Sequence, residues 1–182
     1  MSKSINQREL FDGDHTIYWP EKYEPVIEYL KNGTANKESA SSLYKLNVHV
    51  VVLAACLGIV NNLKIPFNEK EKRKEIPLSA FNNNDLAIYI HLVALLDSKE
   101  PNVNLLRNFE GESSAVKIFE QYVSGGLEIL YERYLQGFVD APFFFINDLL
   151  MSNVNFFKDT TSSTSTVDHK NSLPPEEELN LF

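Results

Sequence analysis

The segment that most constrains the fold is an apolar run over residues 50–60, which reads VVVLAACLGIV. Its leucines continue a helical spacing that begins earlier in the chain, so the sequence predicts a helix over 43–60. The valines could instead form a buried strand, but Leu53, Leu57 and the paired alanines favour the helix. A helix with so little polar surface is usually covered by neighbours all round. We therefore expect it to lie at the centre of the domain.

Helical spacing recurs along the chain. In the stretch after residue 80, three asparagines are candidate caps, Asp85 is expected in the first turn, and the expected apolar face is Leu86, Ile90, Val93 and Leu95 or Leu96. Another long stretch contains Gly125 and Gly126, and each glycine weakens a helix by about 1 kcal/mol relative to alanine. The pair therefore marks either a kink or a close approach of another backbone. Helices are expected within residues 21–32, 81–99, 112–137 and 139–154.

The intervening segments set the domain limits. Residues 61–80 combine asparagines, two prolines and a charge run, which favours a long connection or a small hairpin. The expected fold class is all-α: a single compact helical domain of about five or six helices with a disordered C-terminal tail. We predict a flexible N-terminal arm over 1–19, the helical domain over 20–157, and over 158–182 a disordered tail with a terminal docking peptide.

Charge and cysteine content narrow the class of protein. The net charge is −8, so any contact with a nucleic-acid phosphate backbone needs a local basic patch. Cys56 is the single cysteine and lies in the apolar run, which indicates a core residue in a reducing compartment. The N-terminus lacks the apolar region of a signal peptide, and the longest apolar run is well below the roughly 18 residues that span a bilayer. A cytoplasmic protein without a membrane segment is expected.

An enzyme would need a constellation that the sequence does not display, such as a phosphate-binding glycine loop or paired metal ligands. Asp12, Asp14 and His15 have the ligand types for a divalent cation, although a polar turn is the simpler interpretation. His91 and His49 are better interpreted as core histidines than as catalytic bases. We assign no catalytic, cofactor-binding or metal-ligating residues, and no cofactor.

Two charged groups have alternative interpretations. Glu128 and Glu132 lie one helical turn apart, as paired acid or metal-binding carboxylates would, but nearby cations favour a solvated face. The one basic cluster could neutralise DNA phosphates, or it could be a solvated loop balanced by interleaved glutamates. Its possible DNA contacts are Lys70, Lys72, Arg73 and Lys74.

Three stretches resemble a known family: VVVLAACLGIVNN, then IPLSAF, then IFEQYVSGGLEILYERY. They are similar to the small helical proteins called DNA-phosphorothioation-associated protein 4, found beside dnd-type DNA sulfur-modification genes. The resemblance covers residues from about 23 to 150 and implies a bacterial or archaeal genome-defence accessory. It supplies no catalytic residues. It depends on apolar patterning together with Gly58, Tyr122, Gly125, Gly126 and Leu127.

The last five residues, ELNLF, resemble the pentapeptide by which bacterial polymerases and repair proteins dock on the β sliding clamp of DNA polymerase III. The usual form of that peptide is Gln-Leu-Ser/Asp-Leu-Phe. Leu179, Leu181 and Phe182 match it, Asn180 takes the small polar position, and Glu178 replaces the glutamine. Alternatively, these side chains fold back on the protein's own apolar groove, match by chance, or dock on another partner as single-strand-binding protein tails do.

Together these features predict a non-enzymatic accessory of a phosphorothioation-linked anti-phage defence system. Its expected partners are the sliding clamp and other proteins of the system, with weak DNA contact at most. The competing hypothesis is a nuclease subunit, or another defence enzyme, whose active site is completed by a partner.

Overall fold

The computed structural model describes residues 15–32, 43–68, 70–97, 109–136, 142–143 and 145–151. Contacts divide the chain into two units, Met1–Phe145 and Ile146–Phe182. In the second unit the described residues, 146–151, are helical. Residues 1–14 of the expected arm and the whole expected tail, 158–182, lie outside the described residues. The description below concerns the first unit.

Helices α2 (Asn47–Val60) and α5 (Phe109–Leu135) approach each other closely enough for their backbones to touch at two glycines. A Cβ atom added to Gly58 would lie 2.2 Å from the carbonyl oxygen of Tyr122, and one added to Gly126 would lie 1.7 Å from that of Ala54. Side chains larger than hydrogen are therefore excluded at both positions. Of the two interpretations of the Gly125–Gly126 pair, the close backbone approach is correct, and α5 continues as a helix through it.

The connection that follows α2 also crosses α5. A Cβ on Gly125 would lie 1.9 Å from the carbonyl oxygen of Leu63. Two residues further on, the Ile65 N–H donates to the carbonyl oxygen of Gln121 at 3.0 Å. The three glycines thus allow α2 and the connection after it to contact α5 side by side, at adjacent residues of the same turns.

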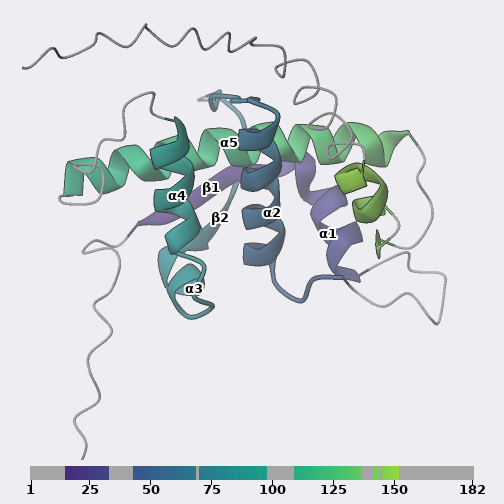
Figure 1. The fold of residues 1–182 in the computed structure, drawn as a ribbon, viewed down its shortest axis with the longest axis horizontal. Helices are drawn as coiled ribbons and strands as arrows, with labels where there is room; N and C mark the ends of the chain where they lie inside the picture. The colour runs from purple at the N-terminus through teal and green to yellow at the C-terminus, as the bar shows by residue number, and fades with distance from the viewer. Residues whose placement is uncertain are drawn as a thin grey trace, which may run out of the picture. The chain divides into compact units, whose positions relative to one another are not determined.

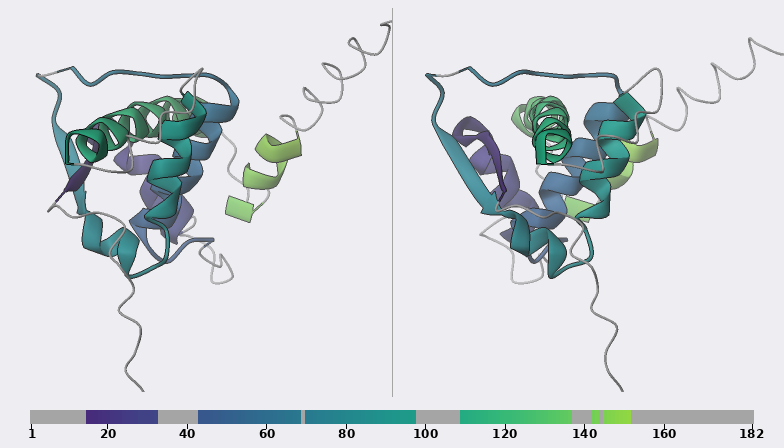
Figure 2. Two further views of the ribbon diagram at one scale, coloured as in Figure 1. Left: turned by 60° about the vertical axis from the view of Figure 1, so that its left-hand side comes forward. Right: turned by 90° about the vertical axis from the view of Figure 1, so that its left-hand side faces the viewer.

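Helix α5 forms the middle of three layers (Figure 1). In the right-hand view of Figure 2, where α5 is seen nearly end-on, helices α2 and α4 (Ile88–Asp97) lie on one side of it and the two strands on the other. A third helix, α1 (Glu24–Asn32), contacts both α2 and α5. Its Tyr29 ring lies 5.3 Å, centroid to centroid, from that of Tyr134 on α5. The 27-residue α5 is therefore the element on which the others assemble.

The strands form a small antiparallel sheet that the sequence did not indicate. Strand β1 (Thr16–Pro20) pairs with β2 (Arg73–Pro77), with Ile17 opposite Ile76. Residues 16–19 thus belong to the domain, so the expected arm over 1–19 was too long at its end. The short 3-10 helix η1 (Glu21–Tyr23) leads from β1 into α1. Neither a plain connection nor a local hairpin describes 61–80, because the partner of β2 lies near the N-terminus.

The described residues confirm the all-α class, with the two-stranded sheet as its one addition. Two details of the prediction were wrong. Helix α2 begins at Asn47 rather than 43, after Leu46 in an extended conformation and without a side-chain cap. The asparagines after residue 80 do not cap α4: they end helix α3 (Leu78–Asn82) and form a turn in which Asp85 has φ 57°.

The core faces of these helices follow the predicted spacing only in part. On α4, Ile90, Val93 and Ala94 are buried, and of the two leucines considered for the core face, Leu95 is half-buried and Leu96 is 61% exposed. On α2 most side chains from Val48 to Gly58 are buried, but Leu53 and Cys56 are half-buried and Val60 is exposed. Contrary to expectation, α2 is not covered on all sides by the described residues. No helix among those described is long and apolar enough to cross a membrane.

Candidate functional site

Three glutamates of α5 face residues 15–23, the segment that contains β1 and η1. Glu112, Glu120 and Glu128 are spaced eight residues apart, and we call them the carboxylate row. Each contacts a different point of that segment. Glu112 Oε2 lies 3.4 Å from His15 Nε2, Glu120 Oε1 accepts from the Tyr18 N–H at 2.8 Å, and Glu128 accepts from the Tyr23 hydroxyl. The row therefore anchors the sheet to α5 by polar contacts.

Glu120, the middle member of the row, is buried, with 7% of the residue exposed. Burial raises its pKa to about 7, against opposing effects of the Tyr18 N–H, Arg73 and Lys117. Its oxygen accepts from the edge of β1 that faces away from β2, where no other strand lies among the described residues. A carboxyl group that titrates near neutrality thus stabilises the outer edge of β1.

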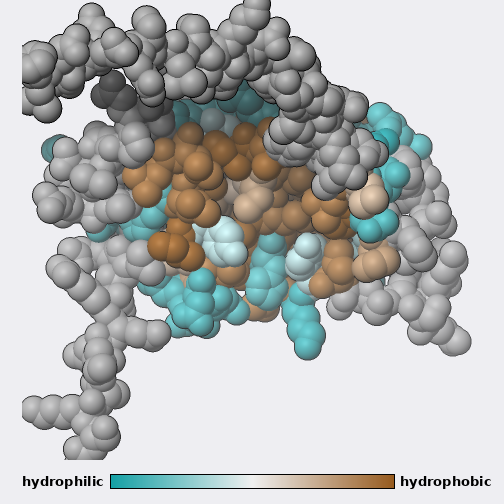
Figure 3. All heavy atoms as spheres, in the orientation of Figure 1, coloured by the Kyte–Doolittle hydropathy of each residue, from teal (hydrophilic) through white to brown (hydrophobic). Residues whose placement is uncertain are grey.

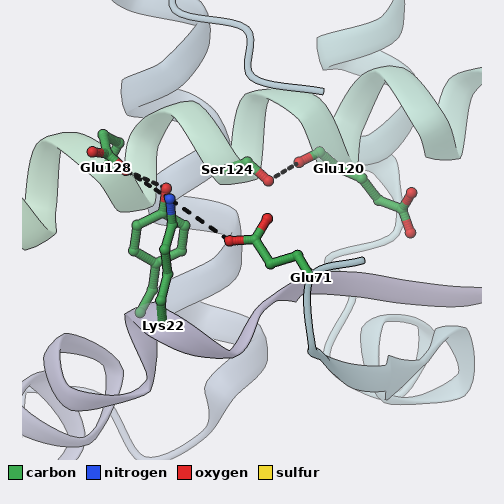
Figure 4. A network of polar contacts seen from close by, with 6 residues as sticks. Lys22, Glu71, Glu120, Ser124 and Glu128 are labelled. Carbon is green, nitrogen blue, oxygen red and sulfur yellow. Dashed lines mark hydrogen bonds and ion pairs between the residues drawn. The ribbon is translucent and has the colours of Figure 1, made fainter. Parts of the chain in front are cut away.

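Glu128 belongs to a more exposed network (Figure 4). Lys22 Nζ lies 3.5 Å from Glu128 Oε2 and 3.7 Å from Glu71 Oε1. The same ammonium lies 4.6 Å from the centroid of the Tyr23 ring. Burial and the hydrogen bond to Glu128 raise the pKa of Tyr23, so its hydroxyl stays protonated and serves as a donor. The network joins η1, α5 and the segment before β2.

A second polar cluster joins the connection after α2, the end of α4 and the middle of α5. Lys64 Nζ lies 2.7 Å from Asp97 Oδ2, and the Tyr122 hydroxyl donates to Asp97 Oδ1 at 2.7 Å. Burial opposes ionisation of Asp97, but the hydrogen bonds from Lys64 and Tyr122 outweigh it and lower the pKa of this carboxyl. Burial and Asp97 raise the pKa of Tyr122 to about 12. The cluster carries no net charge, because Lys64 neutralises Asp97.

A pocket of about 310 Å³ lies at the start of α2. It carries two ammonium groups, of which Lys31 is already paired with Glu28 at 2.9 Å. The side-chain oxygen of Asn47 is buried without a hydrogen-bond partner. The pocket is lined by Lys31, Lys45, Leu46, Asn47, Val48, Ile76, Ala80 and Asn84.

The basic cluster is split by the structure. Lys74 lies 3.6 Å from Glu21 and 3.8 Å from Glu24, while the Arg73 guanidinium lies 5.0 Å from the centroid of the Phe67 ring. Lys70 and Lys72 are exposed, and neither makes an ion pair among the described residues. The four cations lie in and just before β2 but do not converge on one point.

Other candidate residues are not brought into a shared site. Glu132 is exposed, whereas Glu128 is engaged by Lys22 and Tyr23. His91 is buried in α4, and His49 lies near the Tyr44 ring, 6.3 Å between centroids. Within the described part of the chain, no group of three or more His, Cys, Asp or Glu side chains could hold a metal ion. Asp12, Asp14 and the peptide Glu178, Leu179, Asn180, Leu181 and Phe182 lie outside the described residues.

Comparison with family models gave a match to DNA sulphur modification system-associated protein 4, over residues 19–167. The chain belongs to this family. Comparisons with curated proteins and with solved structures gave no match.

Membership in the DNA sulphur modification system-associated protein 4 family confirms the resemblance seen in the sequence. The residues that carried it meet in space: Gly58 contacts the backbone of Tyr122, and Gly125 and Gly126 contact Leu63 and Ala54. The resemblance therefore marks the crossing of α2 and α5. The peptide 178–182 lies beyond the matched residues.

Sequence reasoning missed the carboxylate row. The spacing of eight residues is visible in the chain, but the partner of Glu120 is 102 positions away in the sequence. Nothing in the local pattern of α5 distinguishes Glu120, which is buried, from Glu132, which is exposed.

Proposed function

We propose that this protein is a cytoplasmic, non-enzymatic accessory of a DNA sulphur modification system with an anti-phage role, and that it acts by binding other proteins. The observation that carries the proposal is the family match over residues 19–167. The geometry of the described acids supports a binding role, because Glu112, Glu120 and Glu128 each contact the protein's own residues within 15–23. Their oxygens are used to hold the fold together.

In this proposal the sliding clamp recruits the protein through Glu178, Leu179, Asn180, Leu181 and Phe182. Leu181 and Phe182 would each bury a large apolar side chain in a pocket, worth roughly 1.5–3 kcal/mol apiece before ordering costs. Pro174 and Pro175 restrict the backbone ahead of the peptide and reduce the entropy lost on docking. Glu178 accepts hydrogen bonds as a glutamine carbonyl would, but it cannot donate as the amide does.

Binding of the full chain to purified sliding clamp tests recruitment. We expect saturable binding by fluorescence anisotropy or calorimetry, and at least a tenfold loss of affinity in the double variant Leu181→Ala, Phe182→Ala. The matched control is Leu173→Ala, an apolar truncation in the same segment that leaves the pentapeptide intact. Glu178→Gln should bind more tightly, because it restores the amide donors. Absence of binding at clamp concentrations of several hundred micromolar would sink recruitment by this peptide.

The competing function is a nuclease subunit or other enzyme completed by a partner. The observation that favours it is the exposed group of Lys22, Glu71 and Glu128, since two carboxylates beside an ammonium can bind a cation or move a proton. Metal-dependent cleavage of DNA by the chain with its system partners, abolished by Glu71→Gln, would support it. Under the accessory proposal, that substitution leaves any cleavage by the assembled system unchanged.

A further inference from the structure

The outer side of α2 is apolar and incompletely covered. Ala54 and Gly58 contact α5, and Cys56 follows Ala54 by two residues, which is about 200° around a helix of 3.6 residues per turn. Cys56 therefore lies opposite α5. Leu53 and Val60, three residues before it and four after it, extend the same side, and Val60 is 46% exposed.

Helix α4 continues this surface. Ile88, Leu92 and Leu96 follow one another at intervals of four residues and are 50%, 47% and 61% exposed. The two helices are in contact, and the ion pair between Lys64 and Asp97 joins their C-terminal ends. Figure 3 shows the resulting apolar surface over α2 and α4 on the side away from α5. We call it the α2–α4 face: Leu53, Cys56, Val60, Ile88, Leu92 and Leu96.

The composition of both helices indicates that this side is buried against another surface. A helix that is hydrophobic all round is normally buried all round, and neither α2 from Val50 to Val60 nor α4 before Asp97 carries a charged side chain. The ions nearest the end of the face, Lys64 and Asp97, neutralise each other. The face is therefore apolar and electrically neutral within a chain of net charge −8.

We propose that the α2–α4 face binds the same face of a second copy of this chain across a two-fold axis. Side chains at intervals of four residues form a ridge, and two such ridges interdigitate in the commonest class of helix packing. Ile88, Leu92 and Leu96 form this ridge, and a second copy supplies an identical one. A two-fold contact uses the same patch on both subunits, so a self-complementary ridge fits it.

Charge and size also favour a second copy and set the strength of the contact. Two copies that each carry −8 repel one another, and a neutral face lets them meet without adding like charges at the contact. A standard stable interface uses roughly 20–30 residues a side, whereas this face has six principal residues with half-buried Tyr89 and Leu95 beside them. The dimer is therefore weak, and its population increases as the protein concentration rises.

Sedimentation velocity of the full chain over a concentration series, from a few micromolar to about 1 mM, tests the proposal. We expect a concentration-dependent shift from the 20.8 kDa monomer to a species of twice that mass. Leu92→Glu should weaken dimerisation at least tenfold, because two copies of the charge meet in an apolar contact. The matched control is Leu135→Glu, which places the same charge at a leucine of α5 that is 64% exposed; its dimerisation should stay within twofold of the unmodified chain.

Cys56 supplies a second readout that does not depend on a variant folding normally. It is the chain's single cysteine and lies on the proposed contact. Its rate of reaction with a maleimide should fall several-fold between low and high protein concentration. A chain that stays monomeric at every concentration, or whose Cys56 reacts at one constant rate, overturns the proposal. A dimer that Leu92→Glu leaves intact also overturns it, because the contact then lies elsewhere. Neither assay contains the clamp, so the result is independent of recruitment.

Discussion

The two sides of α5 are built by opposite means. Towards α2 and the connection after it, α5 offers Gly126 and Gly125, and backbones touch there with no side chain between them. Towards the sheet it offers the carboxylate row, whose oxygens reach β1 and η1 through hydrogen bonds. The first contact tolerates no added volume, whereas the second depends on particular acceptor atoms. Substitutions on the two sides should therefore destabilise the fold for different reasons, by steric overlap towards α2 and by loss of a hydrogen-bond acceptor towards the sheet.

Gly126→Ala should produce the largest effect. Helix propensity alone predicts that alanine stabilises α5 by about 1 kcal/mol, but the new Cβ would lie 1.7 Å from the Ala54 carbonyl oxygen. Because backbone must move to relieve that contact, we expect destabilisation of about 3 kcal/mol or more. Urea unfolding followed by circular dichroism measures it. A variant as stable as the unmodified protein would show that α2 and α5 do not meet as closely as described.

Glu120→Ala tests the other side of α5 and should have an intermediate effect. It removes the acceptor of the Tyr18 N–H and opens a gap beneath β1, which costs about 1–3 kcal/mol for a buried donor left unpaired. Glu132→Ala on the same helix is the control, since an exposed residue should change the free energy of unfolding by no more than about 0.5 kcal/mol. Equal effects of the two substitutions would contradict the anchoring role of Glu120.

The smallest effect expected is on how the free energy of unfolding changes with pH. The folded state raises the pKa of Glu120 from 4.5 to about 7, so folding favours its protonated form. The stability this gives is complete below pH 4.5 and is lost progressively as the pH rises to about 7, where the folded protein also ionises. Glu120→Gln should flatten this part of the stability profile, measured by unfolding at a series of pH values. If the free energy of unfolding of this variant depends on pH as in the unmodified protein, a group other than Glu120 causes that dependence.

The two sides of α5 also differ in how far the sequence revealed them. The Gly125–Gly126 pair predicted either a kink in the helix or a close approach of another backbone. Glycine destabilises a helix relative to alanine, so two in succession indicate a structural requirement at that point. The sheet was missed, since β1 and β2 are five residues each and pair across a long stretch of chain. The carboxylate row was missed because burial of a glutamate depends on the element packed over it.

Spacing likewise left one face of α4 ambiguous. Two series of apolar residues follow helical intervals on α4. One contains Ile90 and Val93, and the other contains Ile88, Leu92 and Leu96. Periodicity identifies the inner face only where the other face is polar. The choice between Leu95 and Leu96 for the core face therefore stayed open for the same reason that α4 has an exposed apolar side.

The two-stranded sheet has a further consequence for solubility. An open strand edge is a template for pairing with another chain, and a sheet of two strands has two such edges. Glu120 occupies the edge of β1 at Tyr18, while β2 carries Arg73, Lys74 and Glu75 and ends at Pro77. Charged side chains and proline are the devices that keep strand edges from joining. Arg73 and Lys74, first considered for DNA contact, are thus expected to disfavour pairing of this strand edge with another chain.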